Sequence, residues 1–386
     1  MDAAKRARRL SLIAILSSCM AFAIGMGLTL PLLSLILERR GFPGAVNGMN
    51  LATAGLAAFF VTPQVPGFIR RFGTARYLGG SLVLAAAALV AIYETPSLWL
   101  WFPVRFCLSV GLNGLFVASE FWINQLADEH NRGRYIALYG TAISVGFGIG
   151  PAVLFFVGTH GILPFALGSG MLLFAIIPLF LARHEAPRLD EEHAHGVFGA
   201  VRAAPTILLA AFVFGAIDAG LGGLFPVYAV RSGYDEAHAA LALTAMSLGS
   251  MVFQYPLGML ADRFDRRMLM IVCASAGIVG AGLTPLAIGV PAAMYVLLFF
   301  WGGIVMGIYT IGLTLLGERF KGPALASANA AYIMLYSIGL LGGPLAEGVA
   351  LDAWNPHGLM VVLAAISTIY VLFLILRPQV AAPSPP

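Results

Sequence analysis

Twelve long stretches of this chain are apolar and almost free of charge, and this pattern constrains the fold more than any other feature. A helix of roughly 20 apolar residues is long enough to cross a bilayer. Only 10% of the 386 residues are charged, against about 25% in ordinary soluble domains, which excludes a water-soluble globular protein. Charged or turn-rich breaks delimit the expected spans as 10–37, 45–69, 76–94, 98–125, 135–158, 161–182, 205–230, 237–261, 268–288, 291–317, 324–350 and 357–376.

The spans are expected to be helices. Hydrocarbon offers no hydrogen-bond partners, so each spanning segment must satisfy its own backbone groups. The roughly ten-residue alternating segments of a membrane β-barrel are not seen. Three cysteines do not indicate a disulfide-stapled secreted domain. The fold class predicted is an all-α membrane protein.

The distribution of Lys and Arg predicts the orientation. With the N-terminus in the cytoplasm, 18 of the 22 basic residues fall on the inner side, which agrees with the excess of positive charge in cytoplasmic loops. Arg39, Arg40 and Arg231 fall outside, and Arg105 lies within a span. We therefore expect both termini to be cytoplasmic.

A polar stretch in the middle of the chain separates the first six spans from the last six. It predicts an N-terminal six-helix half over 1–182, a cytoplasmic linker over 183–204 and a C-terminal half over 205–386. Segment 190–195 contains acidic residues and histidines that could bind a metal weakly, but a solvated linker is the preferred interpretation. Segment 196–202 is a candidate short surface helix.

The two halves repeat each other. Span five contains Tyr139, Ser144, Gly146, Gly150 and Pro151, and span eleven contains the same residue types 193 positions later. The second set is Tyr332, Ser337, Gly339, Gly343 and Pro344. Arg71-Phe72 and Arg263-Phe264 also match, at an offset of 192. Duplicated six-helix bundles of this kind form many secondary transporters, with the site near the midplane between them.

The loop between spans eight and nine carries a charged motif. It reads Gly258-Met259-Leu260-Ala261-Asp262-Arg263-Phe264-Asp265-Arg266-Arg267. In this motif Asp262 can cap a neighbouring helix N-terminus, and the arginines can pair with acids. The motif resembles the cytoplasmic loop signature of the major facilitator superfamily, G-x-x-x-D-R-x-x-R-R. With twelve spans and the repeat, the resemblance covers essentially the whole chain, and it implies transport by alternating access.

The equivalent loop of the first half departs from this signature. It reads Pro66-Gly67-Phe68-Ile69-Arg70-Arg71-Phe72-Gly73, with Arg70 where the family has Asp. An arginine cannot accept hydrogen bonds from a helix N-terminus, so we expect Arg70 to pair with a carboxylate instead. The candidates are Glu120, Asp128, Glu129 and Glu318; the alternative is an arginine at the lipid headgroups without a partner.

Span four carries the polar side chains Arg105, Ser109, Asn113 and Glu120 on one face. An arginine in the membrane costs roughly 2.5–3.5 kcal/mol even on the lenient insertion scale, so it needs a partner or a function. Arg105 with the small residues that follow it resembles the span-four motif of proton-linked family members. A cavity function is preferred over a purely structural ion pair.

Asp218 lies near the middle of span seven, beside Gly220, Gly222, Gly223 and Pro226, which weaken the helix and suggest a hinge. In the family that the chain resembles, spans one, four, seven and ten line the cavity. Asp218 is therefore the leading candidate for a proton carrier, with Arg105 as its partner or as a substrate anchor. A static bridge between the two charges is the alternative.

Two further acids are candidates. Glu120 lies near the cytoplasmic end of span four, where an ion pair with Arg132, Arg134 or Arg70 is favoured over a transported-proton site. Glu347 in span eleven shares a helix face with Tyr336, and it either lines an outer vestibule or is an interfacial acid.

Two motifs bear on the subgroup. Gly146-x-x-x-Gly150-Pro151 resembles the span-five motif of many family antiporters, but its repetition at 339–344 favours a role in packing and bending. These two segments are expected at pseudo-two-fold-related positions between the halves. Segments 120–124 (EFWIN) and 131–134 (NRGR) resemble the small bacterial YcaD-like branch, and this resemblance implies a location in the inner membrane of a bacterium.

Signatures of enzymes, a P-loop, a dinucleotide fingerprint and an H-E-x-x-H metal motif are not found in the sequence, and no cofactor or metal site is expected. The expected function is secondary transport of a small organic solute. A net charge of only +4 is too small to suggest nucleic acid as a partner. Protons and the lipid bilayer are the other expected partners, and the protein is expected to be a monomer. The alternatives are a lipid flippase on the same fold and a membrane receptor or scaffold that does not transport.

Overall fold

The computed structural model describes residues 2–127, 132–187, 204–320 and 322–376, and every regular element in them is helical. The helices before the central linker are α1 (Asp2–Arg39), α2 (Gly44–Val61), η1 (Thr62–Gln64), α3 (Val65–Phe72), α4 (Thr74–Glu94), α5 (Leu98–Leu126), α6 (Arg132–Val157), α7 (Leu163–Phe174) and α8 (Ile176–Leu181). Those after it are α10 (Pro205–Ala219), η2 (Gly220–Leu224), α11 (Phe225–Arg231), α12 (Glu236–Arg263), α13 (Arg266–Ala287), α14 (Pro291–Arg319), α15 (Gly322–Ala353) and α16 (Gly358–Leu376).

The twelve predicted spans are confirmed. Within the described residues, twelve helical segments are long and apolar enough to cross a membrane. Three of these spans are interrupted: η1 joins α2 to α3, Ala175 separates α7 from α8, and η2 separates α10 from α11. Most of the predicted linker, residues 188–203 with the candidate metal segment and surface helix, lies outside the described residues.

The contacts divide the chain into two units. The N-terminal unit comprises residues 1–42, 49–191 and 234–244, and the C-terminal unit comprises 43–48, 192–233 and 245–386. Each unit therefore includes the first residues of a helix whose remainder belongs to the other unit.

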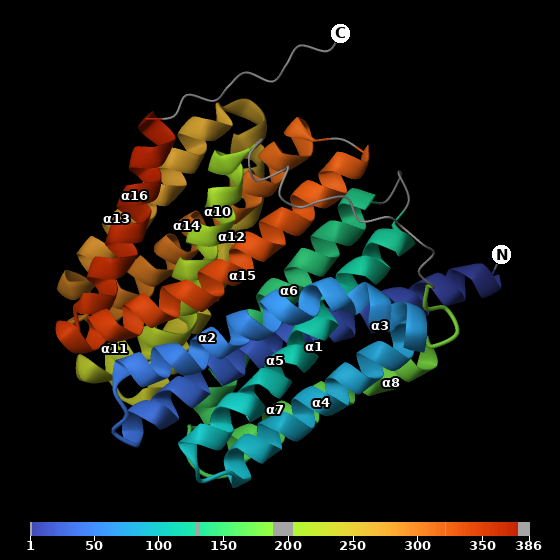
Figure 1. The fold of residues 1–386 in the computed structure, drawn as a ribbon, viewed down its shortest axis with the longest axis horizontal. Helices are drawn as coiled ribbons and strands as arrows, with labels where there is room; N and C mark the ends of the chain where they lie inside the picture. Colours follow the sequence, from blue (N-terminus) through green and yellow to red (C-terminus); the bar gives the residue numbers. More distant parts are fainter. Residues whose placement is uncertain (1, 128–131, 188–203, 321, 377–386) are drawn as a thin grey trace. The chain divides into compact units, whose positions relative to one another are not determined.

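The two units pack their helices in the same order. In the N-terminal unit α1 packs against α5 and α6, and α4 packs against α5 and α7. In the C-terminal unit α10 packs against α14 and α15, and α13 packs against α14 and α16. Figure 1 shows these helices in the colours of the chain. The duplication seen in the sequence is thus also a duplication of helix contacts.

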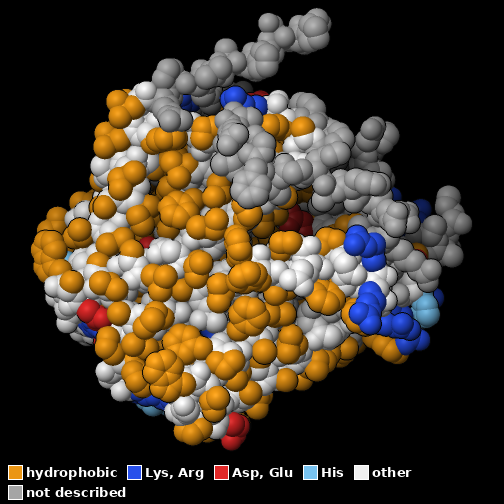
Figure 2. Space-filling view, in the orientation of Figure 1, with side chains coloured by type: hydrophobic (Ala, Val, Ile, Leu, Met, Phe, Trp, Pro, Cys, Tyr) orange, Lys and Arg blue, Asp and Glu red, His pale blue; other side chains and the backbone are white. Residues whose placement is uncertain are grey.

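Apolar side chains form both the interior and much of the surface. Figure 2 shows them over most of the face that it displays. Large side chains such as Phe156, Trp99 and Leu286 are about four-fifths exposed. Exposed apolar patches of this extent mark a membrane or protein interaction surface, and here they lie on helices of membrane-spanning length.

Candidate functional site

Asp218 lies one residue before the point where span seven changes its winding. The α-helix α10 ends at Ala219, and the five residues Gly220–Leu224 form a turn of π-helix before α11 begins. Three of the five are glycine, which is a weak helix former, and Pro226 in the first turn of α11 has no N–H to donate. Isolated π-turns occur frequently at functional sites. The predicted weak point of span seven is therefore present as a defined structural feature.

The Asp218 carboxyl accepts a hydrogen bond from a neutral group. The hydroxyl of Tyr336 on α15 donates to Asp218 Oδ2 at 2.9 Å. Among the described residues of the C-terminal unit, no salt bridge to Asp218 is present. An acid held by a hydroxyl can gain or lose a proton without breaking an ion pair, so this arrangement is suited to reversible protonation.

Aromatic rings cluster around Tyr336, the partner of this carboxyl, in the C-terminal unit. The ring of Phe214, one turn before Asp218, lies 5.3 Å from the Tyr309 ring and 6.0 Å from the Tyr336 ring, centroid to centroid. Tyr309 and Tyr336 are 5.8 Å apart, and the Tyr332 hydroxyl donates to the Tyr309 carbonyl at 2.9 Å. Helices α10, α14 and α15 thus supply a cluster of aromatic rings, one of which bonds the Asp218 carboxyl.

Glu347 contacts the π-turn from the same helix as Tyr336. Its side chain is fully buried, and the three atoms nearest to where a Cβ of residue 220 would lie are its carboxyl atoms. Neither carboxyl oxygen has a hydrogen-bond partner within the described part of the chain. Only glycine at position 220 leaves room for the carboxyl in this place.

Arg105 is buried in the N-terminal unit. Its side chain is 1% exposed, and one guanidinium nitrogen donates to the Thr29 carbonyl of α1 at 3.4 Å. Its Nε has no hydrogen-bond partner among the described residues. Asn113, further along α5, donates to the Ser109 carbonyl at 2.8 Å. Because Arg105 and Asp218 belong to different units, their predicted pairing stays a prediction.

Glu120 is half-buried near the end of α5. Its backbone carbonyl accepts a hydrogen bond from the Asn124 side chain at 2.9 Å. Arg134 is exposed, and the side chain of Arg132 lies outside the described residues. The proposed ion pair of Glu120 therefore stays a prediction.

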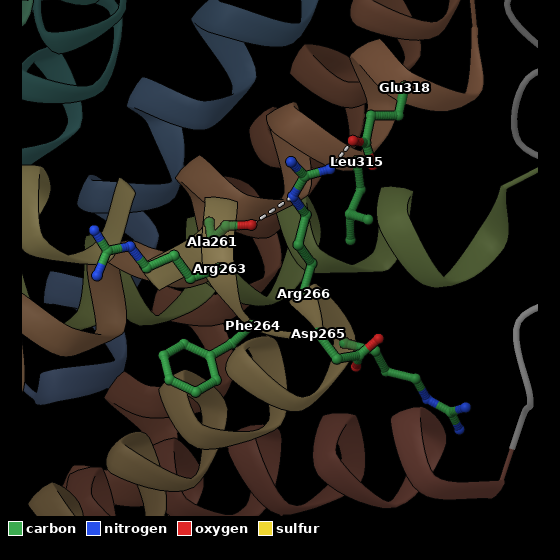
Figure 3. Close-up of a pocket in the computed structure, with 8 residues that line it drawn as sticks. Ala261, Arg263, Phe264, Asp265, Arg266, Leu315 and Glu318 are labelled. Atoms are coloured by element: carbon green, nitrogen blue, oxygen red, sulfur yellow. Dashed lines mark hydrogen bonds and ion pairs between the residues drawn. The ribbon is translucent and has the colours of Figure 1, made fainter. Parts of the chain in front are cut away.

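The loop between α12 and α13 links helix ends through its charged residues (Figure 3). Arg266 pairs with Glu318 at the end of α14, and its Nε donates to the Ala261 carbonyl at 2.9 Å. Arg267 Nε donates to the Leu374 carbonyl of α16 at 3.1 Å. Arg266, Arg267, Glu318 and Asp265 are among the residues that line a shallow pocket of about 330 Å³.

The helix cap in this loop was missed by the sequence analysis. Asp265, a later residue of the same motif, caps α13 by accepting a hydrogen bond from the Met268 N–H at 2.8 Å. The side chain of Asp262 lies outside the described residues, so its predicted role is untested. Gly258 and Arg263 are exposed, and Figure 3 shows Arg263 pointing away from Arg266.

The equivalent arginines of the first half have a different setting. Arg70 and Arg71 lie in the last turn of α3 and are exposed, and the Arg71 guanidinium lies 5.4 Å from the centre of the Phe72 ring. Among the described residues Arg70 has no salt bridge. Of its candidate partners, Glu318 is engaged by Arg266, and residues 128–129 lie outside the described residues. The ion pair of Arg70 stays a prediction.

The two Gly-x-x-x-Gly-Pro segments make equivalent close contacts. A Cβ at Gly146 would lie 2.9 Å from the Met20 carbonyl oxygen of α1, and one at Gly339 would collide with the Phe212 carbonyl of α10. Gly150 likewise approaches the backbone of α1, and Gly343 approaches that of α10. Pro151 and Pro344 follow inside the helices. The packing role is therefore observed within each half; the expected position between the halves stays a prediction.

Two arginine–carboxylate clusters were not predicted from the sequence. They lie at the ends of the spans opposite to the loops that carry Arg70 and Arg266. Arg39 pairs with Glu236 at 2.7 Å in the N-terminal unit. Arg231 pairs with Asp352 at 3.1 Å in the C-terminal unit, where Asp352 also accepts from the Gly44 N–H at 2.8 Å. A signal for them was present, because Arg39 and Arg231 are 192 residues apart, the offset of the repeat.

The fold and its motifs define a class: a membrane protein of twelve spans, built from two similar six-helix halves. The sequence profile of the Major Facilitator Superfamily matches residues 13–241 and 207–386. The chain belongs to this family, and it is a membrane transporter.

Relatives of the same family cover most of the chain. An uncharacterized MFS-type transporter of Bacillus subtilis (strain 168), YfkF, is 27% identical over 375 residues, which is 93% of each chain. The uncharacterized MFS-type transporter YcaD of Salmonella dublin is 27% identical over 322 residues, or 82% of each chain. The predicted resemblance to YcaD-like proteins is confirmed.

Solved structures show the same fold. A mutant of the nucleoside transporter NupG matches with a TM-score of 0.79 and 14% identity, over 95% of this chain and 99% of that one. A bacterial homolog of the human lysosomal transporter Spinster, in an inward-facing and occupied conformation, matches with a TM-score of 0.76 and 15% identity over 95% of both chains.

Proposed function

We propose that this chain is a proton-coupled secondary transporter that moves a small organic solute across the bacterial inner membrane by alternating access. Asp218 carries the coupling proton, and Arg105 is its partner or the anchor of the substrate. Asn113, Glu120 and Glu347 complete the candidate polar set of the cavity.

The hydrogen bond between Asp218 and Tyr336 is the observation that carries this proposal. The carboxyl accepts from a hydroxyl at 2.9 Å and lies next to a π-turn that contains three glycines. Acidic residues within membrane spans are expensive and mark ion or proton pathways. A proton on Asp218 would change the charge at the one place where span seven is weakest.

Arg105 supplies the opposite charge in the proposed cycle. Its Nε has no partner within the described residues, so the guanidinium has a free donor for an anionic group. In a state of the cycle in which Asp218 and Arg105 are paired, protonation of Asp218 would release Arg105 to bind an anionic or polar group of the solute. Proton and solute would then be coupled by competition, without touching each other.

The proposed solute is small, organic and amphipathic or weakly charged. The aromatic rings of Phe214, Tyr309 and Tyr336 beside one carboxyl support this class. Thermal-shift screening of the purified protein against small organic solutes, with nucleosides among them because of the fold shared with NupG, would identify a ligand.

The orientation and environment belong to the same proposal. The excess of Lys and Arg in alternate loops supports cytoplasmic termini, and the bacterial relatives support the inner membrane. Exposed apolar side chains on the spans support direct contact with lipid, and we propose that a single chain forms the transporter.

Transport by reconstituted protein tests the proposal. With a ligand from the screen, Asp218→Asn is expected to abolish accumulation driven by a pH gradient while solute exchange at equal pH is partly retained. Arg105→Ala is expected to weaken both. The control variant Glu185→Gln changes an exposed acid and should accumulate solute normally. Accumulation by Asp218→Asn at the wild-type rate would remove Asp218 from the mechanism.

A further inference from the structure

Helix α15 presents two polar side chains to span seven. The proposed function gives a role in proton coupling to the partner of the first, Tyr336, but none specifically to the second, Glu347. Tyr336 donates to Asp218, and Glu347 contacts Gly220. At about 100° per residue, positions eleven apart on a helix differ by only about 20°. Tyr336 and Glu347 therefore lie on one face of α15, and this face follows span seven from Asp218 to the π-turn.

Among the described residues, no hydrogen-bond donor is available to stabilise a negative charge on the Glu347 carboxyl. Glu347 is 0% exposed, and neither oxygen has a hydrogen-bond donor among the described residues. The π-turn against which it packs has no titratable side chain. The other elements packed against α15 carry six titratable groups: Asp218 on α10, Tyr295, Tyr309, Glu318 and Arg319 on α14, and Tyr370 on α16. None of these groups forms a hydrogen bond with the Glu347 carboxyl.

This setting fits the neutral acid and not the carboxylate. An ionised carboxylate buried without donors is strongly disfavoured, and in proteins such a group takes up a proton instead. The neighbouring positive charge on α11, Arg231, is already engaged by Asp352 at 3.1 Å. The conformation described here is therefore one in which Glu347 carries a proton.

The position of the carboxyl links protonation to the shape of span seven. It occupies the space that a side chain at position 220 would need, and Gly220 is the first residue of the π-turn. If Glu347 loses its proton to water, the carboxylate must leave this contact to reach hydrogen-bond donors. The contact between α15 and the π-turn would open with it.

We infer that Glu347 is a second proton-binding residue, which is docked against Gly220 when protonated and leaves that contact when it releases the proton to water. This inference deepens the proposed coupling function and rests on it for its role in transport. Glu347 lies six residues before the end of α15, about 9 Å along the helix axis. In the proposed orientation it would be the first of the two acids that a proton from outside reaches.

Infrared spectroscopy of the full-length protein in lipid vesicles tests this without a substrate. Protonated carboxyl groups have a C=O stretching band that carboxylates lack, and its intensity can be followed against pH. We expect a component of this band to persist at neutral pH in the wild type and to be absent from Glu347→Gln. The control variant Glu185→Gln, at an exposed acid, should keep it. An identical band in Glu347→Gln and the wild type would overturn the inference.

A second variant tests the contact itself. Gly220→Ala keeps every carboxyl group but fills the space beside the π-turn, where the atoms in the way are the end of a flexible side chain. We expect it to change the frequency or the pH range of the Glu347 component. No change would contradict docking at Gly220, and this test stands if Glu347→Gln does not fold.

The outcomes also separate this inference from the proposed function. Asp218→Asn should leave the Glu347 component in place, whatever it does to transport. A persistent Glu347 component together with proton-independent transport would refute the coupling function but leave the proton-binding site standing. Loss of coupling in Asp218→Asn without any Glu347 component would refute the second site alone.

Discussion

The helix pairs α1–α6 and α10–α15 have the same packing but differ in chemistry. In both pairs two glycines of the second helix approach the backbone of the first. Asp218, Tyr336 and Glu347 in the C-terminal pair correspond, at the repeat offsets of 192 and 193, to Met26, Ile143 and Leu154 in the N-terminal pair. One copy of a duplicated scaffold carries acids where the other is apolar.

This difference separates the requirements of folding from those of function. The glycine contacts are present in both copies, as expected of a feature that the helix packing itself requires. Asp218 and Glu347 have apolar counterparts in the other copy, and burying an ionisable acid is costly unless its charge is paired. The acids in α10 and α15 are therefore better explained by function than by stability.

The largest effect is expected where the two pairs are alike. Gly150→Leu and Gly343→Leu would each place a bulky side chain against the backbone of the neighbouring helix, and we expect each to lower stability by about 3 kcal/mol or more. Thermal unfolding in detergent would measure this. These backbone contacts make folding, and not transport alone, sensitive to both changes. A large loss of stability from one of the two substitutions with none from the other would show that the two helix pairs are not equivalent in packing.

A smaller effect on stability, of opposite sign, is expected at a position where the two helix pairs differ. Glu347→Leu removes a buried, unsatisfied acid and is expected to stabilise the protein by about 1–3 kcal/mol. The reverse change, Leu154→Glu, puts an acid at a fully buried position and is expected to destabilise by a similar amount. Paired thermal-unfolding measurements check both signs. Destabilisation by Glu347→Leu would show that the acid has a stabilising partner.

The smallest effect concerns the first turns of α2 and α12, the second span of each half. Asp352 of α15 accepts hydrogen bonds from the Gly44 and Ala45 N–H groups at 2.8 and 2.9 Å, whereas Asp235, next to α12, accepts from the His238 N–H at 2.8 Å. That backbone bond, with a smaller contribution from the His238 ring, lowers the pKa of Asp235 below its ordinary value.

Acid should therefore loosen the first turn of α12. Because the pKa of Asp235 is lower in the folded state, its stabilisation is present at neutral pH and is lost as the pH falls below about 4. Asp235 is mostly exposed, so the effect is expected to be a local increase in amide hydrogen exchange. Asp235→Asn should remove this pH dependence, while Asp352→Asn should leave it. A pH dependence unchanged in Asp235→Asn would assign it to another group.

The sequence predicts the repeated features well because they depend on local spacing. Apolar runs of membrane-spanning length identify the twelve spans, and the constant offset places Gly146 and Gly339 in equivalent contacts. The weak point at Gly220–Pro226 also follows from residue type alone. These properties need no knowledge of which helices become neighbours.

The polar contacts between helices are less accessible to sequence. Periodicity places Glu347 and Tyr336 on one face of a helix but does not say that Gly220 lies opposite. The pairing of Arg39 with Glu236 joins residues 197 positions apart, and it depends on helix crossings. That Asp265 caps α13 depends on where this helix begins, and helix boundaries are the least predictable feature of a sequence.

The central claim is that Asp218 of the α10–α15 pair couples proton and solute binding. Counting the protons exchanged when a ligand binds tests this claim most directly. Titration calorimetry of a ligand from the screen, in buffers of different ionisation enthalpy, gives the number of protons taken up or released. The wild type and Met26→Leu, changed at the position equivalent to Asp218, should exchange protons on binding, and Asp218→Asn should exchange fewer or none. The same number of protons in all three proteins would contradict the account.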